Sequence, residues 1–149
     1  MPGFHLSEIG RLEAQKLARF IKRKKIKIKE IFTSPLERCR EVSEIIRNEI
    51  GNPAIKIIAK NYLNEWNEGE RTIHIVKRMS YILRNKSSDR LYVSHKDPIR
   101  VLLNKITNQP LREVERWHCP HGAIYEIKIN IQKILPKLLF APKVKKSEG

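Results

Sequence analysis

The stretch Ile28-Lys29-Glu30-Ile31-Phe32-Thr33-Ser34-Pro35-Leu36-Glu37-Arg38 carries the signals of two kinds of secondary structure. Its first six residues include β-branched and aromatic side chains, which favour a strand. Ser34 suits a helix N-cap, Pro35 suits the first helical position, and Glu37 has the spacing of a capping box. The stretch therefore predicts a strand that leads directly into a helix, and Gly51 predicts where this helix ends.

The same strand-to-helix pattern returns at Leu91-Tyr92-Val93-Ser94-His95-Lys96-Asp97-Pro98. Its apolar start predicts a strand buried on both faces, and Asp97-Pro98 opens the next helix. Further helices are predicted at residues 7–25 and 71–84, and further strands at 54–59 and 122–129. Alternating strands and helices predict an α/β fold with a largely parallel sheet, whose sites lie at the carboxyl ends of its strands. The first helix is expected to bury Ile9, Leu12, Leu17 and Ile21.

The length of 149 residues suits one domain, residues 1–149, with a modest core. Apolar residues make up 40% and charged residues 32%, a composition that excludes a disordered chain. No apolar run approaches the length of a membrane span and no signal segment opens the chain, so we expect a soluble, cytoplasmic protein. Cys39 and Cys119 fit a reduced compartment better than a disulfide framework.

The formal net charge of +15 is large for a chain of this size. It indicates either a negatively charged partner or a surface rich in Lys and Arg, of the kind that hyperthermophiles often have. A phosphorylated small molecule, a nucleic acid and an acidic protein are the candidate partners. The densest basic run, residues 22–29, lacks interleaved aromatic side chains on which bases stack, so a nucleic acid is the weaker interpretation.

Three side chains near these junctions suggest an anion site. Arg38 lies one turn into a helix whose first backbone N–H groups are free, a combination that attracts phosphate. His95 places an imidazole at the end of a strand, and Glu65 places a carboxylate beside Trp66, where it can serve as an acid. Each feature alone also fits a purely structural role, and their order and spacing together favour the functional one.

Four segments resemble the histidine phosphatase (phosphoglycerate-mutase-like) superfamily, in the same order and over residues 2–129. Two are specific: Thr33-Ser34-Pro35-Leu36-Glu37-Arg38 is similar to Ser-Ser-Pro-Leu-x-Arg, and residues 93–100 are similar to Val-Ser-His-Gly-x-x-Ile-Arg. Two are weaker: residues 6–14 are similar to Leu-Thr/Ser-x-x-Gly-x-x-Gln-Ala, and Leu63-Asn64-Glu65 to Leu-x-Glu. The resemblance implies a phosphoglycerate-mutase-like, three-layer α/β fold.

The resemblance also implies roles for individual residues and a phosphorylated small molecule as substrate. Arg38 would bind the phosphate, His95 would stabilise its oxygens in the transition state, and Glu65 would protonate the leaving oxygen. Glu68 competes with Glu65 for the role of the acid, and Lys96 stands where the family has glycine. The family needs no metal or other cofactor. Residues 117–121, Trp-His-Cys-Pro-His, include zinc-ligand types but match no common zinc spacing.

The chain departs from the family at the nucleophile. The family's phosphohistidine lies in an Arg-His-Gly sequence at the end of the first, central strand, and this tripeptide occurs nowhere in the 149 residues. We therefore expect an N-terminally truncated domain whose sheet lacks this strand and whose open edges invite self-association. His5 is not a convincing substitute for the nucleophile.

The function expected from the resemblance is hydrolysis of a phosphomonoester or transfer of its phosphoryl group, in a form that is inactive because the nucleophile is absent. Mutase and phosphatase activities are not separated by the motifs. A non-catalytic protein that binds a phosphorylated ligand is one alternative, and a basic nucleic-acid-binding domain is a weaker one. No interaction with a membrane is expected.

Overall fold

The computed structural model describes residues 5–84, 89–108, 124–129 and 134–140. Its centre is a three-stranded parallel sheet in the order β2-β1-β3, formed by β2 (Lys56–Ala59), β1 (Glu30–Thr33) and β3 (Arg90–Val93). Thr33 lies opposite both Ala59 and Val93, so the three strands end at the same edge. The predicted parallel sheet is thus confirmed, and both strand-to-helix junctions lie at this edge.

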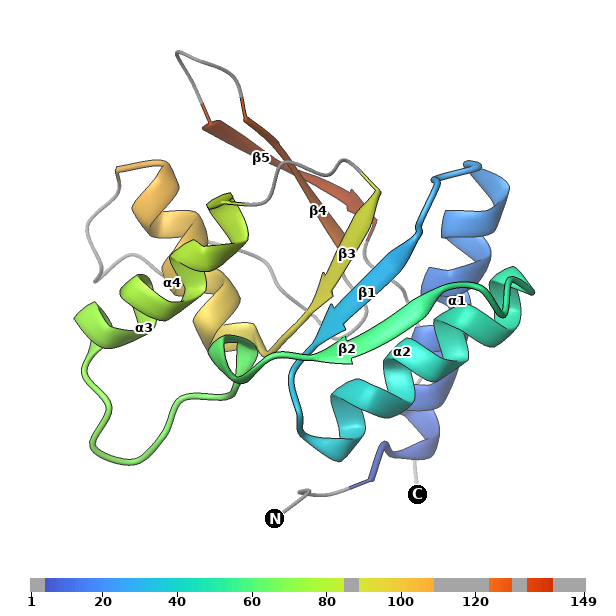
Figure 1. The fold of residues 1–149 in the computed structure, drawn as a ribbon, viewed down its shortest axis with the longest axis horizontal. Helices are drawn as coiled ribbons and strands as arrows, with labels where there is room; N and C mark the ends of the chain where they lie inside the picture. Colours follow the sequence, from blue (N-terminus) through green and yellow to red (C-terminus); the bar gives the residue numbers. More distant parts are fainter. Residues whose placement is uncertain (1–4, 85–88, 109–123, 130–133, 141–149) are drawn as a thin grey trace.

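Two helices cover each face of the sheet (Figure 1). The first face carries α1 (Glu8–Arg23) and α2 (Glu37–Ile50), and the second carries α3 (Thr72–Met79) and α4 (Lys96–Ile106). Two short 3-10 helices, η1 (Asn61–Leu63) and η2 (Ser80–Arg84), flank α3. The predicted three-layer arrangement follows, and none of the described helices is long and apolar enough to cross a membrane.

The alternating side chains of β1 belong to two separate hydrophobic cores, because successive residues of a strand point to opposite faces. Ile31 is fully buried in the core with Ile21 of α1 and Ile46 of α2. Phe32, the next residue, packs in the core with Ile75 of α3, on the other face. The central strand therefore holds both helical layers.

The first helix is capped as predicted and buries Leu17 and Ile21 as predicted, whereas Ile9 is half-buried and Leu12 is exposed. The hydroxyl of Ser7 accepts a hydrogen bond from the backbone N–H of Gly10 at 3.0 Å. Leu12, predicted to be inward, is 45% exposed, because the small side chains of Ala14 and Ala18 form the buried face together with Leu17. The buried face was predicted from the large apolar side chains alone, and the alanines were not considered.

The second helix begins at Glu37, two residues later than predicted. Leu36 takes the N-cap position with extended backbone, and the hydroxyl of Ser34 accepts the N–H of Leu36 at 3.3 Å. Gly51 ends the helix in the left-handed region, with φ of 76°, as its position in the sequence predicts. Ser34 is therefore not a conventional cap, and its hydroxyl is available to the candidate site.

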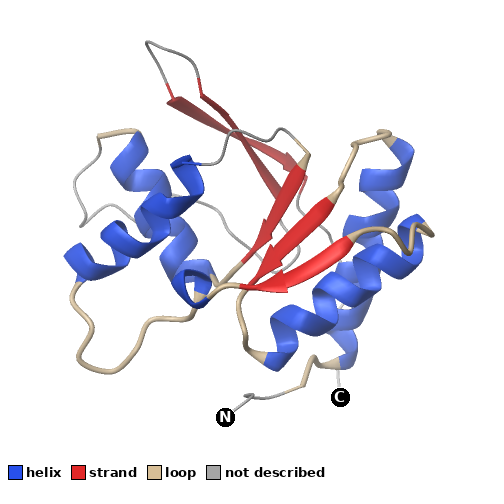
Figure 2. Ribbon diagram, in the orientation of Figure 1, coloured by secondary structure: helices blue, strands red, loops and turns tan. Residues whose placement is uncertain are grey.

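The third strand is half-buried along its length, although its sequence predicted burial on both faces. Among the described strands, β3 pairs only with β1, which leaves one of its edges open. A second, antiparallel sheet pairs β4 (Ile124–Ile129) with β5 (Ile134–Phe140), shown in red in Figure 2. The sequence predicted β4 but not β5, because Pro136 interrupts its apolar pattern.

Replacing Ile46 by Ala is expected to lower the free energy of unfolding by about 2–5 kcal/mol, because Ile46 is fully buried and its removal leaves a cavity between α2 and β1. Ile73→Ala is the matched control. The Ile73 side chain is 66% exposed on α3, and its loss should change stability by about 0.5 kcal/mol or less. Urea unfolding measures both, and equal effects would contradict the described packing.

Candidate active site

The shared carboxyl edge of the three strands brings together side chains from four parts of the chain. Ser34 directly follows β1, and His95 follows β3 at the N-cap position of α4. Glu65 lies in the loop after η1, which itself follows β2, and Arg38 lies in the first turn of α2. The backbone N–H of Ser34 donates to the carbonyl of Val93 at 2.9 Å, so the parallel pairing extends into the site.

Arg38, His95 and Glu65 form a triangle of interacting side chains. Nη2 of Arg38 lies 3.2 Å from Nδ1 of His95 and 3.6 Å from Oε2 of Glu65, and those two atoms are 3.5 Å from each other. The His95 side chain is 3% exposed, whereas those of Arg38 and Glu65 are 35% and 38% exposed. The imidazole therefore forms the buried side of the triangle, and the two charged groups form its solvent side.

Both nitrogens of the His95 ring have partners. Arg38 donates to Nδ1, because a guanidinium has no acceptor, so the proton of the neutral ring lies on Nε2. Nε2 then donates to the hydroxyl of Ser34 at 2.9 Å, and Ser34 donates onward to Oδ1 of Asn64 at 3.3 Å. Sequence reasoning gave Ser34 only a capping role and gave Asn64 none, since nothing in the spacing shows that they meet the imidazole.

Burial and neighbouring positive charges keep His95 neutral. Desolvation, followed by the positive charges of Arg38 and Arg78, lowers the pKa of His95 to about 4. A ring with this pKa carries no proton on Nδ1 near pH 7. Nδ1 can therefore accept the hydrogen bond from Arg38. A negatively charged group placed beside the ring would raise the pKa of His95 and favour a proton on Nδ1.

Cys39 also lies in the site, although the sequence analysis considered it only as a sign of a reduced compartment. Its sulfur lies 3.7 Å from Nε2 of His95, and its thiol donates to the carbonyl of Ser94 at 3.8 Å. Burial raises the pKa of the Cys39 thiol to about 11. With this pKa, Cys39 packs against the ring as a neutral thiol. It is therefore a poor nucleophile, because thiolates rather than thiols are nucleophiles.

The loop after η1 presents Glu65, and not Glu68, to the other two residues. Within the described residues, Glu65 is the carboxylate that contacts both Arg38 and His95, while Glu68 is exposed. Trp66 does not bury the Glu65 carboxylate as the sequence suggested. Its indole donates to the carbonyl of Glu70 at 2.7 Å, and its backbone N–H donates to Oε1 of Glu65 at 2.9 Å. Lys96 is exposed at the start of α4.

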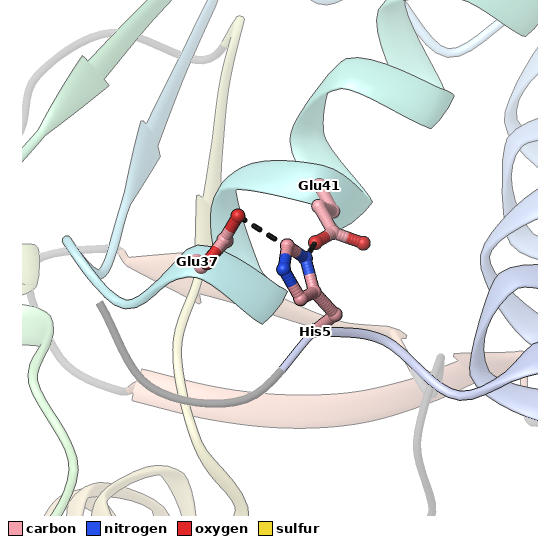
Figure 3. Close-up of side chains that lie close together, drawn as sticks. All are labelled: His5, Glu37 and Glu41. Atoms are coloured by element: carbon pink, nitrogen blue, oxygen red, sulfur yellow. Dashed lines mark hydrogen bonds and ion pairs between the residues drawn. The ribbon is translucent and has the colours of Figure 1, made fainter.

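One group of potential metal ligands comes together in the described part of the chain, with ligand atoms within 4.8 Å of one another: His5, Glu37 and Glu41 (Figure 3). Nδ1 of His5 lies 2.7 Å from Glu41 and 3.1 Å from Glu37. The hydrogen bond with Glu41 raises the pKa of His5, and the negative charges of the two carboxylates raise it further. The contacts of His5 with the two carboxylates account for this cluster, which ties the segment before α1 to α2. Residues 117–121, considered above as zinc ligands, lie outside the described residues.

Solved structures share this fold. Bacillus stearothermophilus YhfR matches with a TM-score of 0.74 at 18% identity, over 90% of this chain and 83% of that one. A phosphoglycerate mutase from Plasmodium falciparum matches with a TM-score of 0.64 at 19% identity, over 90% of this chain and 94% of that one. At such identities the likeness concerns the fold alone.

Sequence comparisons agree with the structural ones. A curated 2,3-bisphosphoglycerate-dependent phosphoglycerate mutase from Methylobacterium sp. (strain 4-46) is 37% identical over 65 residues, which are 44% of this chain and 31% of that protein. The aligned part thus spans less than a third of this relative. The profile of the histidine phosphatase superfamily (branch 1) matches residues 1–74 and residues 69–140, well over half of the chain. This coverage and the shared fold show that the chain belongs to the histidine phosphatase superfamily.

Proposed function

We propose that the triangle of Arg38, His95 and Glu65 binds the phosphoryl group of a phosphomonoester, and that the domain serves the hydrolysis or transfer of that group. The observation that carries the proposal is the approach of the three side chains to within 3.6 Å of one another, from three separate elements. A cation, a buried imidazole and a carboxylate at one point are the groups that phosphoryl transfer requires.

Each of the three residues has a distinct part in this proposal. Arg38 is half-exposed and offers two or more donors to phosphate oxygens. A phosphate dianion beside His95 offsets the positive charge of Arg38, so the ring takes up a proton on Nδ1 and donates to the phosphate. Glu65 is on the solvent side, where the leaving oxygen of a substrate emerges, and it supplies the proton that this oxygen needs.

The Arg-His-Gly sequence in which the family carries its nucleophile does not occur in the 149 residues. Cys39 does not replace it, since burial raises the pKa of its thiol to about 11. We therefore infer that this polypeptide by itself binds phosphate without forming a phosphohistidine. Phosphate recognition and phosphoryl transfer are separable in this chain.

Inorganic phosphate is expected to raise the melting temperature of the 149-residue chain, and Arg38→Ala is expected to abolish the effect. A ligand that binds only the folded state stabilises it by mass action, by roughly 1.4 kcal/mol at ten times its Kd. Arg40→Ala is the matched control, because Arg40 is an exposed arginine on the same helix and its loss changes the net charge equally.

Phosphate stabilisation that survives Arg38→Ala but disappears in Arg40→Ala would contradict the proposed pocket. Retention on DNA that falls with salt and is indifferent to Arg38 would instead favour nucleic-acid binding. The densest basic run connects α1 to β1 at the amino ends of the strands, opposite the candidate site, so the two modes are expected to be separable.

The 149-residue chain is expected not to turn over p-nitrophenyl phosphate, and a longer version with an upstream strand ending in Arg-His-Gly is expected to do so. In that version, Glu65→Gln should lower kcat for an alkyl phosphate by about 10²-fold or more, because an alkoxide is a poor leaving group without an acid. The loss should be much smaller for p-nitrophenyl phosphate, whose leaving group needs little protonation.

Glu68→Gln is the control in the same longer version, since Glu68 is exposed on the same loop. It should leave both substrates unaffected. Turnover by the 149-residue chain that His95→Ala removes would show that a nucleophile is already present. A substrate-dependent loss in Glu68→Gln, and none in Glu65→Gln, would reassign the acid.

His95 is expected to make the fold less stable as the pH falls from 6.5 towards 4. In the unfolded chain the imidazole takes up a proton near pH 6.5, whereas burial lowers its pKa in the folded state to about 4. The unfolded state therefore binds more protons in this window. Urea unfolding at pH 7 and pH 5 should show an extra loss on the order of 1 kcal/mol in the wild type relative to His95→Gln. Equal losses in the two proteins would show that His95 is not held in its neutral form.

A further inference from the structure

The loop that carries Glu65 is held by an arginine that the triangle does not include. Arg78 lies in the last turn of α3, and its side chain is only 16% exposed. Nη1 donates to the carbonyls of Tyr62 at 2.9 Å and Asn64 at 2.7 Å, and Nη2 donates to the carbonyl of Glu65 itself at 3.1 Å. Three backbone groups around the candidate acid are thus bound to one guanidinium.

The remaining donors of Arg78 bind a carboxylate farther along the same loop. Nε donates to Oε2 of Glu70 at 2.7 Å and Nη2 donates to Oε1 at 2.9 Å, and the Glu70 side chain is 12% exposed. All five N–H donors of the guanidinium are therefore used, two on the Glu70 carboxylate and three on carbonyls. The Arg78 hydrogen bond lowers the pKa of Glu70, because it favours the charged form of the carboxyl group.

The one intervening carbonyl is bound from the sheet side. The hydroxyl of Ser94, between β3 and His95, donates to the carbonyl of Leu63 at 2.6 Å. The carbonyls of residues 62 to 65 are thus all bound by side chains, three by Arg78 and one by Ser94. These bonds fix the path of the end of η1 and of the loop that follows it, as pairing with neighbours fixes the path of a strand.

We propose that Arg78 is a positioning residue for Glu65: by binding the backbone up to Glu65 and the Glu70 side chain after it, Arg78 holds the Glu65 carboxylate against Arg38 and His95. The proposal rests on the proposed function in that phosphate is taken as the ligand of the triangle. Arg78 acts through the loop rather than on the ligand, and only an arginine suits the role, because a lysine at residue 78 has three donors on one nitrogen and cannot reach five acceptors.

The test compares Arg78→Lys, Glu65→Gln and the double variant, with phosphate affinity measured by calorimetry at pH 8. Removing the Glu65 charge about 4 Å from the bound anion should tighten phosphate binding by about fivefold. Arg78→Lys keeps the positive charge but releases the loop, so phosphate should also bind more tightly. The double variant should bind phosphate as Glu65→Gln does, because an effect that acts through Glu65 disappears when Glu65 is absent.

A second readout follows the loop without any ligand. The backbone N–H of Trp66 donates to the Glu65 carboxylate, and its indole donates to Glu70, so both resonances should shift in Arg78→Lys. Lys77→Gln is the control, because Lys77 is an exposed cation on the same helix and should move neither the resonances nor the affinity. Should Arg78→Lys fail to fold, Glu70→Gln provides a second variant, because it weakens the binding of the Arg78 guanidinium to residue 70. It should move the Trp66 signals in the same direction.

Unchanged Trp66 signals in Arg78→Lys, or an effect on phosphate affinity of equal size with and without Glu65, would overturn the positioning role. Weaker phosphate binding in Arg78→Lys would overturn it as well, since that outcome means a direct effect on the anion. Failure of the proposed function looks different: the wild-type chain would not bind phosphate, or would still bind it after Arg38→Ala. In that case the Trp66 signals alone decide whether Arg78 holds the loop.

Discussion

The rest of the site depends on the hydrogen bonds of the buried His95 imidazole. A buried polar ring is costly unless both nitrogens are satisfied, and here Arg38 satisfies one nitrogen and Ser34 the other. Those partners come from the end of β1 and the start of α2, whereas the ring comes from the end of β3. The hydrogen bonds can form only while β1 and β3 keep their register, because a shift of one residue would reverse the direction of every side chain in the strand.

Two different physical constraints place the three members of the triangle. Arg38 and His95 are fixed by a parallel sheet and by two helix starts, which are regular structures with many cooperative hydrogen bonds. Glu65 is fixed by single side-chain bonds to the backbone of an irregular loop, chiefly those of Arg78. Of the three residues, Glu65 is consequently expected to be the one most sensitive to a single substitution. The positions of Arg38 and His95 depend instead on the pairing of the sheet.

The sequence predicted what regular structure determines and missed what side-chain contacts determine. Both strand-to-helix junctions and the parallel sheet followed from apolar periodicity and turn residues, and the three layers followed from the resemblance to the family. The predicted burial of Leu12 was wrong, because periodicity does not show that the small residues Ala14 and Ala18 are buried in its place. Nothing in the sequence pattern indicated a role for Arg78, because it lies within a helix and most of its partners are backbone carbonyls. Ser34 was predicted to be a helix cap. Its contact with His95 was not predicted, because the two residues are 61 positions apart in the sequence.

Phosphate recognition and phosphoryl transfer make different demands on this fold. Under the proposed function, recognition needs a cation and a partly buried polar group whose charge can change, and Arg38 and the buried His95 would supply these. Transfer also needs a nucleophile in line with the leaving oxygen, on the far side of the phosphorus from Glu65. Within the part of the chain that the structure describes, β3 has one unpaired edge, and His95 follows the end of this strand. A strand that paired with this edge in parallel would end beside the imidazole, because parallel strands in register share their carboxyl edge. Under the proposed function, such a strand could bring a nucleophile to the phosphate from the side of His95.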